Sequence, residues 1–305
     1  MPADVTFLIP AFNAEQTIAR AIESALAQKG VAVEIVVADD CSTDRTVEIA
    51  RSFPDVRVVT LEQNRGPSGA RNAGMDVARG RWIAVLDADD AVYPDRLRRL
   101  LSLAEEKNAQ IVADNLDVVA ENGARRPMFG PAFIGNRGEL TLDRFIAGNL
   151  LFKWRFSLGY MKPVFERRFL MENRLRYVET LSVGEDYIFL ASALAKGGRC
   201  IVEPTAGYAY HIREGSISRV LELRHIEAML EADREFLRAH VLDKAALAAQ
   251  AKRTRSLEHG ASFLILVEHL KKRSAAKALA TALRHPFALR HLRMPIGARV
   301  QRIMN

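Results

Sequence analysis

An apolar run that ends abruptly in carboxylates is the most constraining feature of this chain. Residues 81–86 read RWIAVL, and residues 87–90 read DADD. Such a run, bounded by Gly80 and by acids, predicts a strand that is buried on both faces. In an open α/β sheet, ligands bind at the carboxyl ends of the strands, where like charges repel unless a cation lies between them. The run therefore indicates a site for a hard divalent metal, with helix capping by Asp89 or Asp90 as the alternative.

Short apolar runs alternate with segments of helical periodicity through the first hundred or so residues. The expected strands cover residues 5–9, 34–38, 56–61 and 82–86, and a fifth begins at 111. The expected helices cover residues 14–28, 68–78 and 96–107, and a further one ends near 52. This order predicts an α/β fold with a mostly parallel, Rossmann-like sheet and flanking helices. From residue 221 onward the apolar period is helical, which predicts a C-terminal helical region.

The sequence contains neither of the common phosphate-binding loops. A G-x-G-x-x-G fingerprint is absent after the first expected strand, and a G-x-x-x-x-G-K-[ST] loop does not occur. A pyrophosphate would then have to be held by a metal and by side chains. Arg65 and Arg71 flank the segment 66–70 at an expected helix N-terminus, where they could supply cationic donors beside the backbone amides. The same segment is equally consistent with a simple loop and helix start.

The positive charge of the chain is concentrated at its C-terminal end. The formal net charge is +7, and nine of the 44 Lys and Arg residues lie between Lys271 and Asn305, a stretch without Asp or Glu. The rest of the chain is near neutral, so the charge does not predict a nucleic-acid partner. Leucines and Phe287 interleave with the basic residues, a pattern typical of an amphipathic helix at a membrane surface. A solvated basic face is the alternative.

The sequence predicts neither a membrane span nor a signal peptide. No run approaches the roughly eighteen uncharged apolar residues of a spanning helix, and the first residues lack a basic region. Cys41 and Cys200 are the two cysteines, and neither lies in a C-x-x-C or metal-type spacing. We therefore expect a cytoplasmic protein, at the inner face of the membrane if the basic segment binds lipid.

Five segments together resemble the ordered motif set of one enzyme family. They are IPAFN at 9–13, ADDCSTD at 38–44, NRGPSGARNAG at 64–74, DADD at 87–90 and GED at 184–186. The set resembles family 2 inverting glycosyltransferases with the GT-A fold, in particular bacterial exopolysaccharide-type enzymes. The likeness runs from residue 4 to about 218 and closes with YHIREGSIS at 210–218, which is similar to the family's R/H-x-x-G-S-x-S segment. It implies a GT-A domain over residues 1–218. Residues 219–305 lie outside the resemblance, and their helical period and basic charge predict a helical region with a basic amphipathic tail.

The resemblance also implies roles for the motif residues. A nucleotide site is implied for Pro10, Phe12, Glu15, Asp39, Asp40 and Asp87, and Arg71 is added to it from its position beside the glycine-rich segment. Within that site Asp40 would read the base with support from Asp39, and Asp87 would lie near the ribose. Asp89 would bind Mg²⁺ or Mn²⁺, with Asp90 as a further candidate.

The chain departs from the family pattern at two places. Cys41 stands where a glycine usually follows the paired acids, which would tighten the turn and leave the carboxylates in place. His211 and Arg213 follow the order His-x-Arg, where Arg-x-His is common, so either residue could meet the diphosphate or the metal.

The chemistry of glycosyl transfer requires two groups that the motifs can supply. Departure of a nucleoside diphosphate needs charge neutralisation, which a metal on Asp89 would provide. The acceptor hydroxyl needs a general base, which Asp186 would provide if residues 184–189 start a helix beneath the crevice. The alternative for Glu185 and Asp186 is favourable charge at a helix N-terminus.

We therefore expect a metal-dependent inverting hexosyltransferase. It would move a hexose from a nucleotide sugar, most simply a UDP-hexose, to a glycan or lipid-linked acceptor in cell-surface polysaccharide synthesis. A nucleotidyltransferase that makes nucleotide sugars is one alternative, but that class usually has a glycine-rich loop and a basic residue where residues 10–13 read PAFN. A membrane-associated binding protein with a dead site is another, and the retained carboxylates argue against it.

Overall fold

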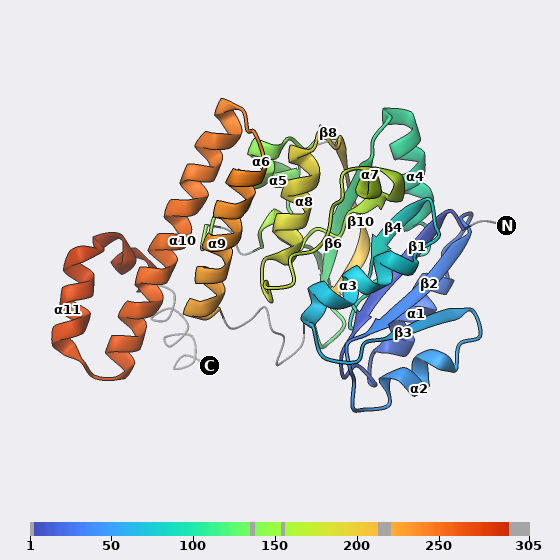
Figure 1. The fold of residues 1–305 in the computed structure, drawn as a ribbon, viewed down its shortest axis with the longest axis horizontal. Coiled ribbons are helices and arrows are strands. Elements are labelled where there is room, and N and C mark those ends of the chain that lie inside the picture. The colour runs from blue at the N-terminus through green and yellow to red at the C-terminus, as the bar shows by residue number, and fades with distance from the viewer. Residues whose placement is uncertain (1–2, 135–137, 154–155, 213–220, 293–305) are drawn as a thin grey trace.

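One large mixed sheet with helices on both faces forms the body of the molecule (Figure 1). The structure is a computed structural model that describes residues 3–134, 138–153, 156–212 and 221–292. Its strands are β1 (Val5–Ala11), β2 (Val33–Asp39), β3 (Val56–Thr60), β4 (Trp82–Val85), β5 (Ala91–Val92), β6 (Ile111–Val119), β7 (Arg125–Pro127), β8 (Gly138–Glu139), β9 (Val164–Glu166) and β10 (Cys200–His211).

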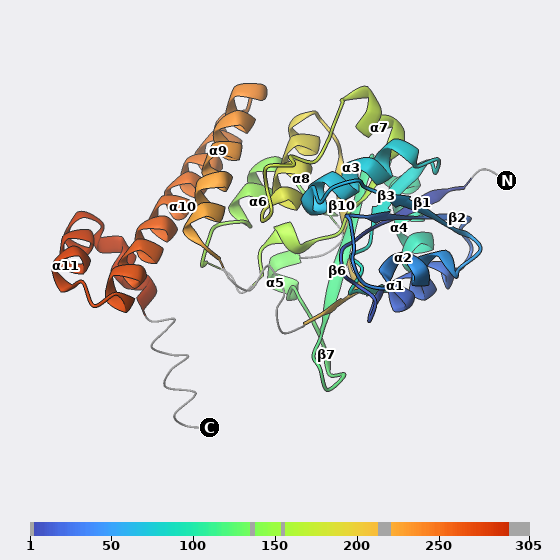
Figure 2. The same ribbon diagram turned by 60° about the horizontal axis from the view of Figure 1, so that its bottom comes forward.

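The helices follow the strands in the alternation that the sequence predicts for its first part. They are α1 (Ile18–Leu26), α2 (Thr46–Arg51), α3 (Gly66–Val77), α4 (Arg96–Lys107), α5 (Pro131–Ile134), α6 (Leu142–Ala147), α7 (Arg167–Glu172), α8 (Glu185–Ala195), α9 (Leu223–Ala239), α10 (Lys244–Lys271) and α11 (Ala275–Arg284). Two 3₁₀ turns, η1 (Leu158–Tyr160) and η3 (Pro286–Leu292), complete the described elements. In Figure 2, α1 and α2 lie on one face of the sheet and α3 lies on the other.

The strand order confirms the expected mostly parallel sheet and adds antiparallel pairings of the short strands β5, β7, β8 and β9. The order is β3-β2-β1-β4-β9-β6-β10-β5, with β7 paired to β6 and β8 to β10. β1 runs parallel to β2 and β4, and β6 runs parallel to β10. β9 enters antiparallel between β4 and β6. With three residues, β9 is too short to be recognised from an apolar pattern.

The middle of the sheet is buried on both faces, as the apolar runs predict. All four residues of β4 are buried, and Phe7, Leu8 and Ile9 of β1 have no exposed surface. Helices cover both faces of these strands, so their side chains alternate between two packed layers. The carboxyl ends of β1, β2 and β4 consequently lie side by side at one edge.

A buried ion pair joins the sheet to α4. Arg96 at the start of α4 has no exposed surface, and its guanidinium contacts the carboxylate of Asp114 on β6 at 2.9 Å. Burial raises the pKa of Asp114, although the charge of Arg96 counteracts this effect. The guanidinium of Arg96 also donates a hydrogen bond to the carbonyl oxygen of Lys162, which precedes β9.

The C-terminal helices α9 and α10 pack against α6 and α8 (Figure 1). Phe236 and Ala246 belong to the same buried cluster as the sheet residues. The guanidinium of Arg253 on α10 contacts Asp233 on α9 at 2.9 Å and lies 3.5 Å from the ring centroid of Tyr187 on α8. The C-terminal region is thus helical as expected, and its division from the GT-A part at residue 218 stays a proposal.

Candidate functional site

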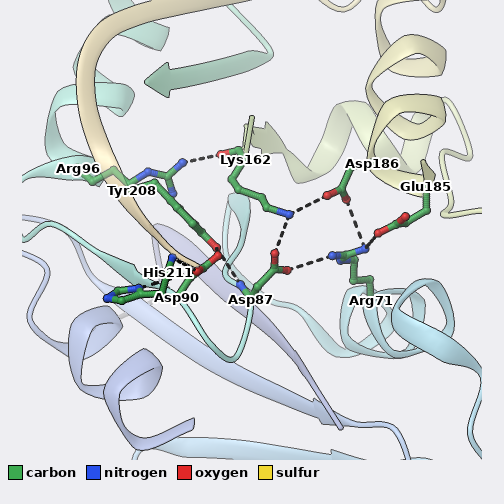
Figure 3. A network of polar contacts seen from close by, with 9 residues as sticks. All are labelled: Arg71, Asp87, Asp90, Arg96, Lys162, Glu185, Asp186, Tyr208 and His211. Carbon is green, nitrogen blue, oxygen red and sulfur yellow. Dashed lines mark hydrogen bonds and ion pairs between the residues drawn. The ribbon is translucent and has the colours of Figure 1, made fainter. Parts of the chain in front are cut away.

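The acidic motifs lie together at the carboxyl edge of the sheet. Asp39 ends β2, and residues 87–90 follow β4. The first turn of α8 brings Glu185 and Asp186 to the same place, close to Asp87 (Figure 3). Segments that are far apart in the sequence therefore supply one cluster of carboxylates.

Two glycines position the helices that border this cluster. Gly74 lets α3 lie directly on β1, because a Cβ at this position would come within 1.8 Å of Leu8 Cδ1. Gly184 precedes α8 with a φ of +90°, a left-handed conformation that favours glycine. The close packing of α3 on β1 brings Arg71 to the carboxylates, and the turn at Gly184 places Glu185 and Asp186 in the first turn of α8.

A buried charge network holds the carboxylates in place (Figure 3). Arg71 donates to Asp87 Oδ1 at 3.0 Å and to Glu185 Oε1 at 2.7 Å, and it lies 3.4 Å from Asp186 Oδ1. Lys162 Nζ lies 2.8 Å from Asp87 Oδ2 and 2.7 Å from Asp186 Oδ2. Arg71 and Lys162 are both buried. The two cations therefore bridge the acids that follow β4 to the acids that begin α8.

The pKa values of Asp87 and Glu185 are shifted in opposite directions. Burial disfavours the ionised form of Asp87, but the charges of Lys162 and Arg71 overcome it and hold the pKa of Asp87 below its usual value. For Glu185, burial and the neighbouring charge of Asp186 raise the pKa, although Arg71 counteracts them. Asp87 is thus held as a carboxylate, whereas Glu185 takes up a proton more readily than an exposed glutamate.

Asp90 links the acidic turn to the end of β10. Tyr208 Oη donates to Asp90 Oδ2 at 2.8 Å and accepts from the backbone N–H of Asp87 at 3.1 Å. The backbone N–H of His211 donates to Asp90 Oδ1 at 2.8 Å. Burial, together with the charges of Asp89 and Asp87, raises the pKa of Asp90 well above its usual value. These contacts assign Asp90 a place in the interior of the turn and put His211 beside the turn.

The expected nucleoside residues lie on two loops that are hydrogen-bonded to each other. Asn13 N–H donates to Ser42 Oγ at 2.9 Å, and Thr43 N–H donates to Asn13 Oδ1 at 2.9 Å. Glu15 Oε2 accepts from the backbone N–H of Arg45 at 3.2 Å. Phe12, on the first loop, is 52% exposed. An aromatic side chain that faces solvent beside the carboxyl ends of strands is available for stacking with a ligand.

The paired acids Asp39 and Asp40 are buried on the second loop. Asp39 Oδ2 accepts from Ser42 N–H at 3.1 Å, while Asp39 Oδ1 is buried without a hydrogen-bond partner among the described residues. Asp40 Oδ1 accepts from Arg65 N–H at 2.7 Å, and burial raises the pKa of Asp40. Cys41 has a φ of +67°, so the position that departs from the family pattern adopts the backbone conformation of a glycine.

Asp89, for which a divalent metal is predicted, lies on the acidic turn together with Asp87 and Asp90. Asp89 is half-buried on the turn after β4, and Arg20 donates a hydrogen bond to its carbonyl oxygen. Within the described residues, no group of three or more His, Cys, Asp and Glu side chains is arranged as a metal cage. Mg²⁺ needs no such cage, because it is commonly bound by one or two carboxylates together with substrate phosphates.

The structure thus separates the predicted residues into two adjoining groups. Those at the ends of β1 and β2 and on the loops that follow are Pro10, Phe12, Glu15, Asp39 and Asp40, and those around the turn after β4 are Arg71, Asp87, Asp89, Asp90, Glu185, Asp186 and His211. Arg71 is directed at three carboxylates rather than at the glycine-rich segment beside it. Arg213 lies outside the described residues.

Sequence reasoning missed Lys162 and Tyr208. Lys162 stands alone in the segment LGYMKPVF at 158–165, which carries no acidic or glycine-rich motif. Its one signal is a single charged residue within an apolar stretch, which indicates burial with a partner. Tyr208 belongs to the apolar run of β10, where a core role is the ordinary interpretation.

Comparisons with known proteins agree with this geometry. The sequence profile described as Glycosyl transferase family 2 matches residues 6–169. The succinoglycan biosynthesis protein ExoO of Rhizobium meliloti (strain 1021) is 59% identical over 302 residues, which cover 98% of this chain and 87% of ExoO. The Escherichia coli protein WfaP, a UDP-Glc:α-D-GlcNAc-diphosphoundecaprenol β-1,3-glucosyltransferase, is 42% identical over 88 residues, 28% of this chain and 35% of WfaP.

A solved structure shares the fold at low sequence identity. The crystal structure of residues 1–349 of Staphylococcus aureus TarS with UDP-GlcNAc has a TM-score of 0.67. It is 19% identical to this chain, and the match covers 92% of this chain and 91% of that one. This likeness supports a GT-A architecture for the sheet and its flanking helices.

Proposed function

Because this chain belongs to glycosyl transferase family 2, we propose that it is a metal-dependent inverting hexosyltransferase of cell-surface polysaccharide synthesis. Its donor would be a UDP-hexose and its acceptor a glycan or a lipid-linked saccharide. The observation that carries the proposal is that Asp87 and Asp186 both contact the ammonium group of Lys162. This contact brings Asp87, a carboxylate on the donor side, close to Asp186, the candidate base. Family membership disfavours the nucleotidyltransferase alternative.

The names of similar proteins support the choice of donor and acceptor. TarS binds UDP-GlcNAc, and WfaP uses a UDP-glucose donor with a diphosphoundecaprenol-linked acceptor. ExoO takes part in succinoglycan biosynthesis and matches nearly the whole of this chain. A uridine nucleotide and a saccharide on a lipid diphosphate are therefore the first candidates to test.

The donor would lie across the two groups of site residues. We place the nucleoside between the loops of Phe12 and Asp40, where an exposed ring can stack on a base and a buried carboxylate can accept from it. The ribose would lie near Asp87. The diphosphate would then reach the turn of Asp89, with His211 at its side.

Asp89, assisted by His211, would hold Mg²⁺ or Mn²⁺ beside the diphosphate. When bound, such an ion neutralises the negative charge that develops on the leaving group. Arg71 keeps Asp87 in place and supplies positive charge at the same edge. Arg213 is a further candidate for the diphosphate on sequence grounds alone.

Asp186 would act as the general base. Its carboxylate accepts the proton of the acceptor hydroxyl while that oxygen forms a bond to the anomeric carbon. The bond from the anomeric carbon to the diphosphate oxygen breaks, and UDP leaves from the opposite side. Because attack and departure occur on opposite faces of the sugar, the configuration at the anomeric carbon inverts.

The C-terminal end of the described chain fits a position at an anionic lipid surface. Among the described residues, no helix is long and apolar enough to cross a membrane. α11 exposes Leu279 and Leu283, with 62% and 74% of their surfaces accessible, and η3 exposes Phe287. Exposed basic residues occupy positions 271–273, at the C-terminal end of α10 and directly after it. We therefore place the protein at the cytoplasmic face of the membrane, where a lipid-linked acceptor would be met.

A screen of nucleotide sugars by thermal unfolding tests the proposal. In MnCl₂, a UDP-hexose should raise the melting temperature, because a ligand that binds only the native state stabilises it by mass action. GDP- and ADP-linked sugars serve as matched controls for the base. A larger shift with one of these controls would overturn the choice of UDP. UDP-sugar binding without any turnover would favour the alternative of a binding protein with a dead site.

A further inference from the structure

Lys162 lies at the centre of the charge network but belongs to none of the recognised motifs. It lies between η1 and β9, and only 7% of its surface is exposed. Its Nζ contacts Asp87 at 2.8 Å and Asp186 at 2.7 Å (Figure 3). A lysine is rarely buried without a specific partner, and here both partners belong to the proposed reaction site.

The charges of the network require this lysine. Asp87, Glu185 and Asp186 are acidic, and among the described residues Arg71 and Lys162 are the two cations that contact them. Without Lys162, one buried guanidinium would face all the acids. Like charges at this distance disfavour ionisation, so at least one carboxylate would then be driven to bind a proton or to move away.

The contacts also orient Asp186 without blocking it. Lys162 contacts Oδ2 of Asp186, and Arg71 lies nearest to Oδ1. A carboxylate has about four acceptor positions on its two oxygens, so each oxygen keeps a position for a further hydrogen bond. The side chain of Asp186 retains 19% of its surface exposed. A base held on both oxygens can thus still accept a proton from an acceptor hydroxyl.

The backbone at Lys162 is fixed from the opposite side. Arg96, which is paired with Asp114, donates to the carbonyl oxygen of Lys162. β9 begins two residues after Lys162 and is paired on both edges, with β4 and with β6. The ammonium group is therefore carried on a rigid part of the sheet, as a group that orients a reacting side chain must be.

We propose that Lys162 is a positioning residue for glycosyl transfer, which holds the carboxylate of Asp186 in a fixed orientation and at a fixed distance from the donor-side carboxylate of Asp87. The inference rests on the proposed function of Asp186 as the base. Lys162 acts through Asp186 and does not itself touch the reacting atoms. A lysine that only stabilised the fold would have no such dependence on Asp186.

A double-mutant cycle separates these two roles. We would measure hydrolysis of whichever of UDP-glucose, UDP-galactose or UDP-GlcNAc the wild type turns over, with water in place of the acceptor. Lys162→Met should lower kcat by about ten- to hundredfold, the usual range for losing a partner that orients a functional group. The donor KM should change much less, since Arg71 still holds Asp87. Lys196→Met, an exposed lysine at the end of α8, is the matched control.

The decisive comparison is made in the Asp186→Asn background. If Lys162 acts through Asp186, adding Lys162→Met to Asp186→Asn should lower the remaining kcat for hydrolysis by less than about threefold. The effects of two mutations on the rate do not add when the two residues work as a unit. An equal loss in both backgrounds would overturn the inference and leave Lys162 a structural residue. The same cycle with Lys162→Arg, which keeps the charge but changes the length, decides the question if Lys162→Met does not fold.

The outcomes also distinguish this inference from the proposed function. Near-normal hydrolysis by Asp186→Asn alone would overturn the role of Asp186 and, with it, the role of Lys162. Loss of hydrolysis by Asp186→Asn, with full activity in Lys162→Met, would overturn only the inference about Lys162.

Discussion

Asp87 and Asp186 share the ammonium group of Lys162, although one follows a strand at the middle of the sheet and the other begins a helix. This relationship fixes the distance between the donor side of the site and the group that would activate the acceptor. A transfer reaction depends on such a distance, because small displacements of a reacting group lower the rate severely.

The proposed base can be tested by an isosteric change. Asp186→Asn keeps the size of the side chain and removes its ability to take a proton, so kcat should fall by about a hundredfold or more. UDP binding, followed by calorimetry, should change little. Asp55→Asn, on an exposed loop, is the control and should leave both quantities unaltered. Near-normal turnover by Asp186→Asn would return this residue to a helix-terminal role.

The proposed role of Asp89 as a metal ligand can be tested by measuring the affinity for UDP instead of turnover. UDP affinity, measured by calorimetry in Mn²⁺, should fall by about tenfold or more in Asp89→Ala or on addition of a chelator, because metal and diphosphate are expected to bind together. Asp55→Ala is the matched control. If UDP binds equally well with and without the metal, Asp89 has no role as a metal ligand.

The two cysteines should differ sharply in reactivity. Cys41 is exposed, whereas burial raises the pKa of Cys200 to about 12. Since the thiolate is the reactive form, a thiol reagent at pH 8 should modify Cys41 at once and Cys200 only after unfolding. The reactivity of Cys200 should rise with pH as its thiolate forms. Rapid modification of both thiols in the native protein would contradict the burial of β10.

The alternation of strands and helices was predictable because parallel strands at the centre of a sheet are apolar throughout. The prediction of strands at 5–9 and 82–86 agrees with β1 and β4 to within two residues at each end. The acids that follow these strands could be placed at one edge of the sheet, because the carboxyl ends of parallel strands lie along the same edge. The positions of Asp40 and Asp87 at this edge could therefore be predicted from the sequence, while their roles in binding stay predictions.

Tertiary contacts without a local pattern could not be predicted. β9 carries three residues, and its pairing partners are remote in the sequence. The contacts of Lys162 depend on that pairing, so nothing near residue 162 could indicate them. The expected helix at 14–28 begins only at Ile18, because backbone groups of residues 13–15 are bound by the loop of Ser42 to Thr46.

The buried pair of Arg253 and Asp233 should be important for stability. Arg253→Met would leave the carboxylate of Asp233 buried without its cation, which should lower the free energy of unfolding by about 3 kcal/mol. Urea denaturation measures this change directly. Arg255→Met, an exposed arginine on the same helix, is the control and should stay within about 0.5 kcal/mol of wild type. Equal stability of the two variants would show that the pair contributes nothing.

Binding to anionic vesicles should depend on the basic residues at the C-terminal end of α10, at positions 271–273. Each Lys or Arg near an anionic surface contributes about 1 kcal/mol, so a triple change of residues 271–273 to Gln should strongly reduce co-sedimentation. Changing Lys29, Arg79 and Arg98 to Gln removes the same charge from exposed positions of the sheet region and serves as control. Binding should also weaken as salt is raised. Equal binding by both triple variants would leave the segment a solvated basic face.

The position of β9 has a consequence for how the chain folds. β1 to β4 can pair with one another once residue 85 is present, but the second half of the sheet, β6 and β10, joins them through β9. Closing so long a loop is entropically unfavourable and tends to be slow. The first strands are therefore expected to form a platform early, during synthesis or refolding. The ammonium of Lys162 arrives only as the sheet closes, so in a partly folded chain Asp87 would be paired with Arg71 alone.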